Sequence, residues 1–248
     1  MQRIAFLLAS LMALIAPPAM AQAIVSQTVV ETVIWVDEDG NEVPAPDEAE
    51  MTSGEDGATW RFVESRPGTV APAPVPQGIA RFGPFRVIDG TRAAMVDVST
   101  SATPAQFAAM LAAYPGIRVL EMVDVPGTED DRANLKLGRM IRARGVATHV
   151  PDGGSVRSGG VELFLAGTSH TAAPGAEFAV HAWEDEDGLG PRDYAESAPE
   201  NRAYVDFYQE MGMSPAEARA FYAMTNSAPF DNARWMNASQ MGQWVRLR

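Results

Sequence analysis

The sequence predicts an α/β domain in which a mostly parallel sheet is flanked by helices. Short apolar runs alternate along the chain with segments that carry helix-capping signals, and this alternation is typical of parallel strands joined by helices. Hydrophobic residues make up 46% of the 248-residue chain, so a sizeable core can form. No internal repeat is recognisable.

The expected strands are runs of apolar and β-branched residues between turn residues. They cover residues 85–88, 93–98, 119–123, 147–150 and 178–181. Helices are expected over residues 103–114, 128–145, 161–166, 199–211, 215–224 and 238–244. Thr103 and Pro104 start the first helix. The capping boxes Ser197-x-x-Glu200 and Ser214-x-x-Glu217 start two later helices. Residues 153–160 are expected to form a glycine-rich loop.

Residues 1–21 have the order of a cleavable signal peptide. Arg3 is followed by an apolar run to Ala16 and by the small-residue motif Ala19-Met20-Ala21. The run is too short for a helix that crosses about 30 Å of hydrocarbon. We therefore expect cleavage after about Ala21 in preference to an uncleaved anchor. The mature protein is then periplasmic or secreted and is not inserted in a membrane.

Residues 22–79 form an acidic, Pro-rich appendage and linker before the main domain, residues 80–248. Within the appendage, Thr28–Val36 and Glu42-Val43 can form a hairpin, and Trp60–Val63 can form one more strand. The rest of the appendage is rich in acidic residues, Gly and Pro, a composition typical of extended linkers.

Composition excludes several classes of function. A net charge of −13 opposes binding to nucleic acid. The absence of cysteine excludes disulfides, a thiol nucleophile and thiolate metal sites. The three histidines, His149, His170 and His181, lack a metal-ligand spacing, and neither a P-loop nor a dinucleotide fingerprint is present. We expect no metal and no cofactor.

A serine and a histidine remain as candidates for chemistry. Ser158 lies at the junction between the glycine-rich loop and an apolar helix, where free backbone N–H groups can face a developing oxyanion. His181 ends an apolar strand, from which it can act as a general base. Taken alone, a loop serine and a half-buried histidine are more often structural.

The order of these motifs resembles the Clp-protease/crotonase-like superfamily, and more closely a group of exported bacterial proteins with a Clp-protease-like domain. In that family a strand runs into a Ser-Pro-Gly-Gly loop, which Asp124-Val125-Pro126-Gly127 resembles. A serine then heads a helix ending in Ala-Gly, as Ser158 does, and a later strand ends in a histidine, as at His181. The resemblance covers about residues 85–244 and implies a ββα spiral.

The resemblance also implies roles for individual residues. Ser158 would be the nucleophile and His181 the base, with backbone N–H groups of Gly127 or Thr128 and of Gly159 as the oxyanion hole. A third, acidic residue follows the histidine in the family, and Asp231 is the first candidate for it. Asp206 is the second, although a solvated helix position explains it as well.

This chain departs from the family pattern beside the predicted oxyanion hole. Thr128 stands where the loop has its second glycine, and a side chain there can close the approach to a carbonyl. The acidic run Glu129-Asp130-Asp131 adds unfavourable charge near an oxyanion.

Two functions follow from these observations. The first is an ATP-independent serine hydrolase of peptidase type in the bacterial cell envelope, acting on a peptide or protein segment. The second is a catalytically inactive Clp-fold binding or scaffold protein of the periplasm. Self-association is open in both, and an ATP-driven unfoldase is not expected as a partner outside the cytoplasm.

Overall fold

The computed structural model describes residues 35–36, 42–43, 61–63 and 70–248. By its internal contacts the chain divides into two units, residues 1–52 and 53–248. In the first unit, β1 (Trp35–Val36) pairs antiparallel with β2 (Glu42–Val43), as the predicted hairpin requires. The predicted signal peptide and most of the predicted appendage lie outside the described residues.

The second unit repeats one pattern, in which a stretch of chain gives one strand to each of two sheets and then enters a helix. The strand pairs are β7 (Val119–Met122) with β8 (Asp124–Val125), β10 (Ala147–Val150) with β11 (Ser155–Arg157), and β12 (His170–Ala172) with β13 (Glu177–Val180). The helices that follow are α3 (Asp131–Ala143), α4 (Gly159–Leu165) and α5 (Pro199–Glu210). The predicted ββα spiral is therefore confirmed.

Both sheets are mostly parallel, as predicted. The larger sheet has the order β12-β10-β7-β6-β5-β4, in which the first four strands are parallel. Its other edge is an antiparallel meander of β4 (Ala80–Phe82), β5 (Phe85–Val87) and β6 (Arg92–Met95). The smaller sheet has the order β14-β13-β11-β8, and only β14 (Arg234–Asn237) is antiparallel.

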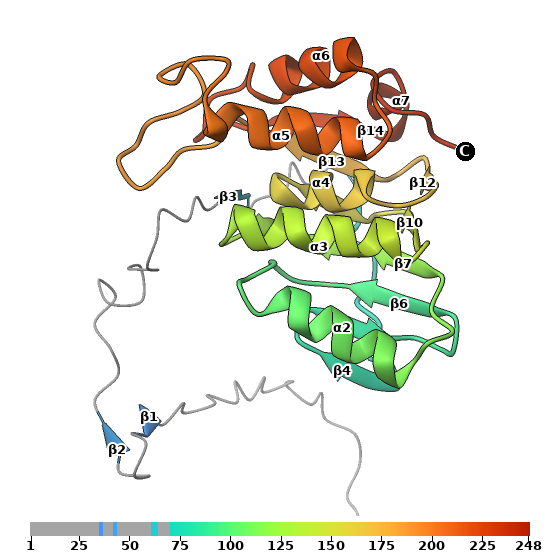
Figure 1. Cartoon of the computed structure of the whole chain (residues 1–248). Coiled ribbons are helices and arrows are strands. Elements are labelled where there is room, and N and C mark those ends of the chain that lie inside the picture. The colour runs from blue at the N-terminus through green and yellow to red at the C-terminus, as the bar shows by residue number, and fades with distance from the viewer. Residues whose placement is uncertain (1–34, 37–41, 44–60, 64–69) are drawn as a thin grey trace, which may run out of the picture. The chain divides into compact units, whose positions relative to one another are not determined.

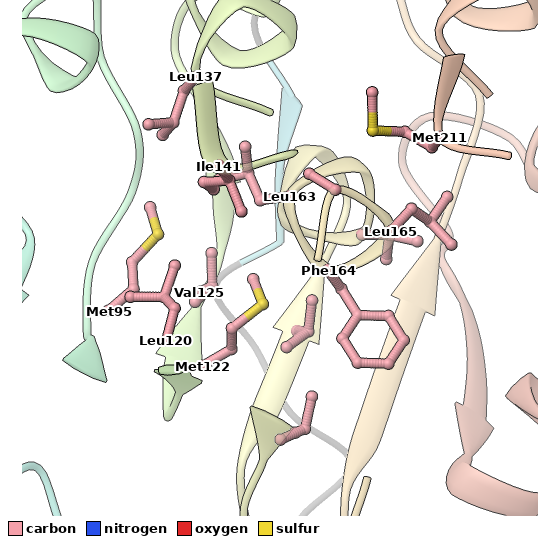
Figure 2. Packing of buried hydrophobic residues seen from close by; sticks show 14 of the residues in the cluster. Met95, Leu120, Met122, Val125, Leu137, Ile141, Leu163, Phe164, Leu165 and Met211 are labelled. Carbon is pink, nitrogen blue, oxygen red and sulfur yellow. The ribbon is translucent and has the colours of Figure 1, made fainter. Parts of the chain in front are cut away.

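Helices cover the sheets in chain order, beginning with α2 (Thr103–Ala113) and continuing through α3, α4 and α5 (Figure 1). Two further helices, α6 (Pro215–Thr225) and α7 (Ala238–Met241), complete the unit. All seven residues of α4 are buried. Figure 2 shows Leu163 and Phe164 of α4 among Ile141 of α3 and Met122 of β7. The helix that follows Ser158 is thus fixed by the core.

Several expected elements differ from the structure. Residues 153–160 are not all loop, because Ser155–Arg157 pairs with parallel strands on both sides and is fully buried as β11. The capping box expected at Ser197 does not form, since α5 begins after Ala198 without a side-chain cap. The box at Ser214 forms with both of its hydrogen bonds.

In the described part of the chain, no helix has both the length and the apolar character needed to cross a membrane. Across the same residues, no group of three or more His, Cys, Asp or Glu side chains is placed to hold a metal ion.

Candidate functional site

Three neighbouring parallel strands of the smaller sheet bring the predicted site residues together. β11 lies between β8 and β13, so the carboxyl ends of all three strands meet at one edge. Ser158 follows β11 directly, His181 follows β13 directly, and Gly127 lies two residues after β8. Ligands of open α/β sheets bind at this kind of edge. The topology therefore places three separate sequence motifs around one point.

Ser158 has a strained backbone. Its φ of 51° and ψ of −126° make it the one non-glycine residue with positive φ among the residues that the structure describes. Its N–H donates to the Ala179 carbonyl of β13 at 2.8 Å, and its carbonyl accepts the Val161 N–H of α4 at 2.9 Å. These bonds hold the turn between β11 and α4. Such strain costs of order 1–3 kcal/mol and is concentrated at functional sites.

The His181 ring is oriented by a backbone carbonyl. Its Nδ1 lies 2.8 Å from the carbonyl oxygen of Ala182, so Nδ1 carries the proton of the neutral ring and donates it. This tautomer gives Nε2 the lone pair that a general base needs. The ring also contacts Phe230 edge-on, with centroids 5.3 Å apart.

Ser158 and His181 line the same small cavity, together with Glu162 and Thr225. The space between these side chains is too narrow for a water molecule. Ser158 is 3% exposed and His181 is 1% exposed. The Ser158 hydroxyl makes no hydrogen bond within the described residues. The serine and the histidine therefore face one enclosed space without being hydrogen-bonded to each other.

A larger cavity lies next to this enclosed site. It measures about 410 Å³ and is lined by Phe230, Trp183, Glu184 and Arg192, among others. Phe230 thus contacts the His181 ring and also belongs to the wall of the larger cavity. The indole of Trp183 is buried and donates to the Tyr222 hydroxyl at 2.8 Å.

The predicted oxyanion residues lie directly beside the serine. Gly127 and Thr128 form β9 (Gly127–Thr128), and both are buried. A Cβ atom on Gly159 would lie 2.6 Å from Cγ2 of Thr128, so the Thr128 methyl rests against Gly159. Because the first N–H groups of a helix have no partner inside it, the N–H of Gly159 suits an oxyanion. The threonine that departs from the family pattern thus covers this glycine.

The acidic run after Thr128 has structural roles. Asp130 caps α3 by accepting the Ala133 N–H at 2.9 Å. The carboxylate of Asp131 is buried and accepts the Tyr204 hydroxyl at 2.7 Å. Asp130 is thus hydrogen-bonded within α3 and Asp131 to α5, and both bonds help to fix the beginning of α3.

The two candidates for a third catalytic residue lie away from the described contacts of His181. Asp231 is exposed in the turn before β14, next to Phe230. Asp206 lies on α5 and pairs with Arg202 at 3.3 Å, one turn away, as a solvated helix residue does. The bond from Nδ1 to Ala182 supplies the orientation that the resemblance assigns to a carboxylate. A catalytic role for Asp231 stays a prediction.

Sequence reasoning missed two buried polar residues of the site. Glu162 lines the cavity and accepts the Tyr208 hydroxyl at 2.6 Å. Its signal is a single charge inside the apolar run from Val161 to Ala166. Asn134 of α3 donates to the Gly159 carbonyl at 2.7 Å, and Ser99 donates to Asn134 at 2.7 Å. No feature of the sequence points to Asn134.

The other two histidines lie on the larger sheet. His149 of β10 is half-buried, and its Nδ1 lies 2.8 Å from the Thr171 hydroxyl. His170 belongs to β12 and is half-buried, with Nδ1 3.0 Å from the Phe164 carbonyl. Burial lowers the pKa of His170, and the positive charge of Arg142 lowers it further.

No protein-family model matches this sequence, and no curated protein matches it. Among solved structures, the chain is similar to the 1510-N membrane protease specific for a stomatin homolog from Pyrococcus horikoshii. The identity is 15%, the TM-score is 0.42, and the match covers 64% of this chain and 70% of that chain. An enoyl-CoA hydratase from Shewanella pealeana is 10% identical with a TM-score of 0.41, over 67% of this chain and 68% of that chain. These similarities are too distant to assign a function, which therefore rests on this chain's own residues.

Proposed function

We propose that the protein is a serine hydrolase of peptidase type. The observation that carries this proposal is the placement of a strained serine and a carbonyl-oriented histidine at the ends of adjacent parallel strands, facing one cavity. The order of the site strands supports the resemblance to Clp-protease/crotonase-like domains. Backbone strain is concentrated at functional sites, and a strained turn carries the serine nucleophile in the α/β-hydrolases.

The chemistry assigns one step to each group. The Ser158 oxygen attacks a carbonyl carbon while Nε2 of His181 takes the hydroxyl proton, and the carbonyl oxygen becomes an oxyanion. The N–H of Gly159 and an N–H of the Gly127–Thr128 segment stabilise that charge. His181 then returns the proton to the leaving amine, which leaves an acyl-serine that water hydrolyses. The Ala182 carbonyl keeps the ring in the required tautomer throughout.

A second candidate function is a binding or scaffold protein that has lost catalysis. The Thr128 methyl against Gly159 favours it, because this contact narrows the approach to the oxyanion donors. The enclosed cavity also favours it, since a substrate must first open the site.

Labelling with a fluorophosphonate probe separates the two functions. We expect the wild-type protein to be phosphonylated on Ser158, with loss of fluoride, and the Ser158→Ala variant to stay unlabelled. Thr128→Ser removes the methyl and keeps the hydroxyl, so it should speed labelling by several-fold. Ser155→Ala, two residues before the nucleophile, is the matched control and should be labelled as wild type. Equal labelling of wild type and Ser158→Ala would reject the hydrolase and leave only the binding function. The absence of labelling in wild type, Ser158→Ala and Thr128→Ser alike would have the same meaning.

The cellular setting belongs to the same proposal. We place the protein in the periplasm or outside the cell, acting without ATP on peptide segments, and we propose no nucleic-acid partner because the net charge is −13. The mass of the mature protein from the envelope fraction tests the location. A chain that begins at about Gln22 is expected, whereas a full-length chain in the cytoplasm would contradict export.

A further inference from the structure

A short segment of the chain before the main domain pairs with the loop beside Ser158. β3 (Arg61–Phe62) is antiparallel to β9, with Phe62 opposite Gly127 and Arg61 opposite Thr128. The next residue continues the ladder, since the Val63 N–H donates to the Pro126 carbonyl at 2.8 Å. Figure 1 shows β3 beside the beginning of α3. The Pro-Gly loop of the site is thus covered on one edge by the chain itself.

The register of this pair decides which way the loop's N–H groups point. Hydrogen-bonding pairs alternate with non-bonding pairs in an antiparallel ladder. Because the Val63–Pro126 pair is bonded, the Arg61–Thr128 pair is of the bonding kind, and the Thr128 N–H points at β3. Thr128 is one of the predicted oxyanion donors, and its methyl rests against Gly159. β3 therefore lies where an extended peptide would meet that donor.

A second stretch before the main domain, residues 71–73, contacts the chain near the other end of the site strands. The Ala73 N–H donates to the Gly153 carbonyl at 2.9 Å, two residues before β11. A Cβ atom on Gly153 would lie 2.2 Å from the Ala71 carbonyl oxygen, and the φ of Gly153 is +71°. Only glycine allows the chain to approach this closely there. The contact of residues 61–63 therefore lies on β9, and that of residues 71–73 lies just before β11, the strand that leads to Ser158.

We propose that β9 is a binding edge for an extended peptide and that residues 61–63 occupy this edge as an intramolecular blocking segment. Strand addition supplies affinity through main-chain hydrogen bonds, which any extended peptide can make. A two-residue strand makes few such bonds, so the segment can leave the edge, yet its attachment gives it an effective concentration in the millimolar range. The proposed consequence, control of the Ser158 site by residues 61–63, rests on the hydrolase function proposed above.

The experiment compares proline with alanine at Val63 in the mature chain. Val63→Pro removes the N–H that donates to Pro126, while φ stays within the range of a strand. Val63→Ala shortens the same side chain and keeps the N–H. A fluorescein-labelled peptide of residues 58–66 is the probe, and fluorescence anisotropy measures its binding. We expect Val63→Pro to bind the peptide at least tenfold more tightly than Val63→Ala, because its own segment no longer competes for β9.

Labelling of Ser158 is measured separately and is expected to be fastest in Val63→Pro. Equal peptide binding by the proline and alanine variants would overturn the blocking segment, whatever the labelling shows. Stronger peptide binding by Val63→Pro without labelling of Ser158 in any variant would keep the binding edge and reject the hydrolase. If Val63→Pro does not fold, the same comparison is made between Arg61→Pro and Arg61→Ala, at the next hydrogen-bonding pair of the ladder, Arg61 with Thr128.

Discussion

The backbone of Ser158 stores strain that a glycine would release. Glycine adopts positive φ as readily as negative φ, whereas alanine there keeps the strain of serine. We therefore expect Ser158→Gly to be more stable than Ser158→Ala by about 1 kcal/mol, measured as the free energy of unfolding in urea. Both variants lack the hydroxyl, so chemistry cannot cause the difference.

Ser239 provides the matched control for this comparison, because it lies within α7, where backbone φ is ordinary. The order should reverse there, with glycine less stable than alanine by up to about 1 kcal/mol. If alanine is the more stable replacement at Ser158 as well, the turn is not strained in solution.

The contact between Thr128 and Gly159 predicts an energetic coupling between the two positions. Gly159→Ala places a Cβ 2.6 Å from Cγ2 of Thr128, and overpacking of this kind costs about 1–3 kcal/mol. Thr128→Ser removes that methyl and keeps the hydroxyl to which the Asp130 N–H donates at 3.0 Å. Gly159→Ala should therefore cost about 1 kcal/mol less in the Thr128→Ser background than in the wild type.

A double-mutant cycle of urea unfolding measures this coupling. Additive costs would mean that the methyl does not press on Gly159 in solution. Gly159→Ala should still lower the stability of the Thr128→Ser variant, because Asn134 Nδ2 also lies 3.2 Å from the added Cβ and limits how far it can move.

At the scale of the elements, the start of α6 gives a clean test of capping. Ser214 accepts the Glu217 N–H at 3.3 Å, and its own N–H donates to the Glu217 carboxylate at 2.8 Å. Loss of such a cap costs about 1 kcal/mol, so Ser214→Ala should lower the free energy of unfolding by that amount. Ser197→Ala is the control, because α5 begins after Ala198 with no side-chain cap. Its effect should stay within about 0.5 kcal/mol, and equal losses in both variants would contradict these helix starts.

The same pair of serines shows what local sequence can predict. Both have glutamate three residues later, and only tertiary packing decides which box forms. The ββα order, the mostly parallel sheets, the position of Ser158 before a helix and that of His181 at a strand end followed from alternating apolar runs and family resemblance. Residues 155–157 were read as loop because glycines surround them, although neighbouring strands on both sides enforce a strand. The bond from Asn134 to Gly159 could not be predicted, because it depends on how α3 packs beside α4. The bond from His181 to Ala182 could not be predicted either, because it depends on the rotation of the imidazole ring.

At the scale of the whole molecule, the residues expected to do chemistry are among the most buried. Ser158 and His181 are buried at the carboxyl ends of β11 and β13, Phe230 contacts His181, and Thr128, which pairs with Arg61 of β3, rests against Gly159. The chain has no cysteine, so no disulfide contributes to this arrangement. The proposed hydrolase function requires a substrate to open the site, and the short β3–β9 ladder is the part of its surroundings that we propose to move.

His170 links three parts of the molecule and makes stability depend on pH. Its Nδ1 faces the Phe164 carbonyl of α4, its own carbonyl accepts the Arg248 N–H at 3.0 Å, and Thr148 of β10 lies 3.5 Å from Nδ1. Burial lowers its pKa, and the charges of Arg142 and Arg248 lower it further. The unfolded chain therefore takes up a proton first as the pH falls below about 6.5, which favours unfolding.

The resulting prediction is a stability that is complete above about pH 7 and declines as the pH falls through about 6.5, in part because of His170. His170→Asn keeps a donor for the Phe164 carbonyl and does not titrate. Urea unfolding at a series of pH values from 8 to 5 should therefore give a shallower decline for His170→Asn than for wild type, with parallel curves above about pH 7.5. All carboxylates are common to both proteins, so the difference between the curves isolates the histidine. Identical slopes below pH 6.5 would mean that His170 takes up its proton equally well in the folded chain, and that β12 does not bury it as described.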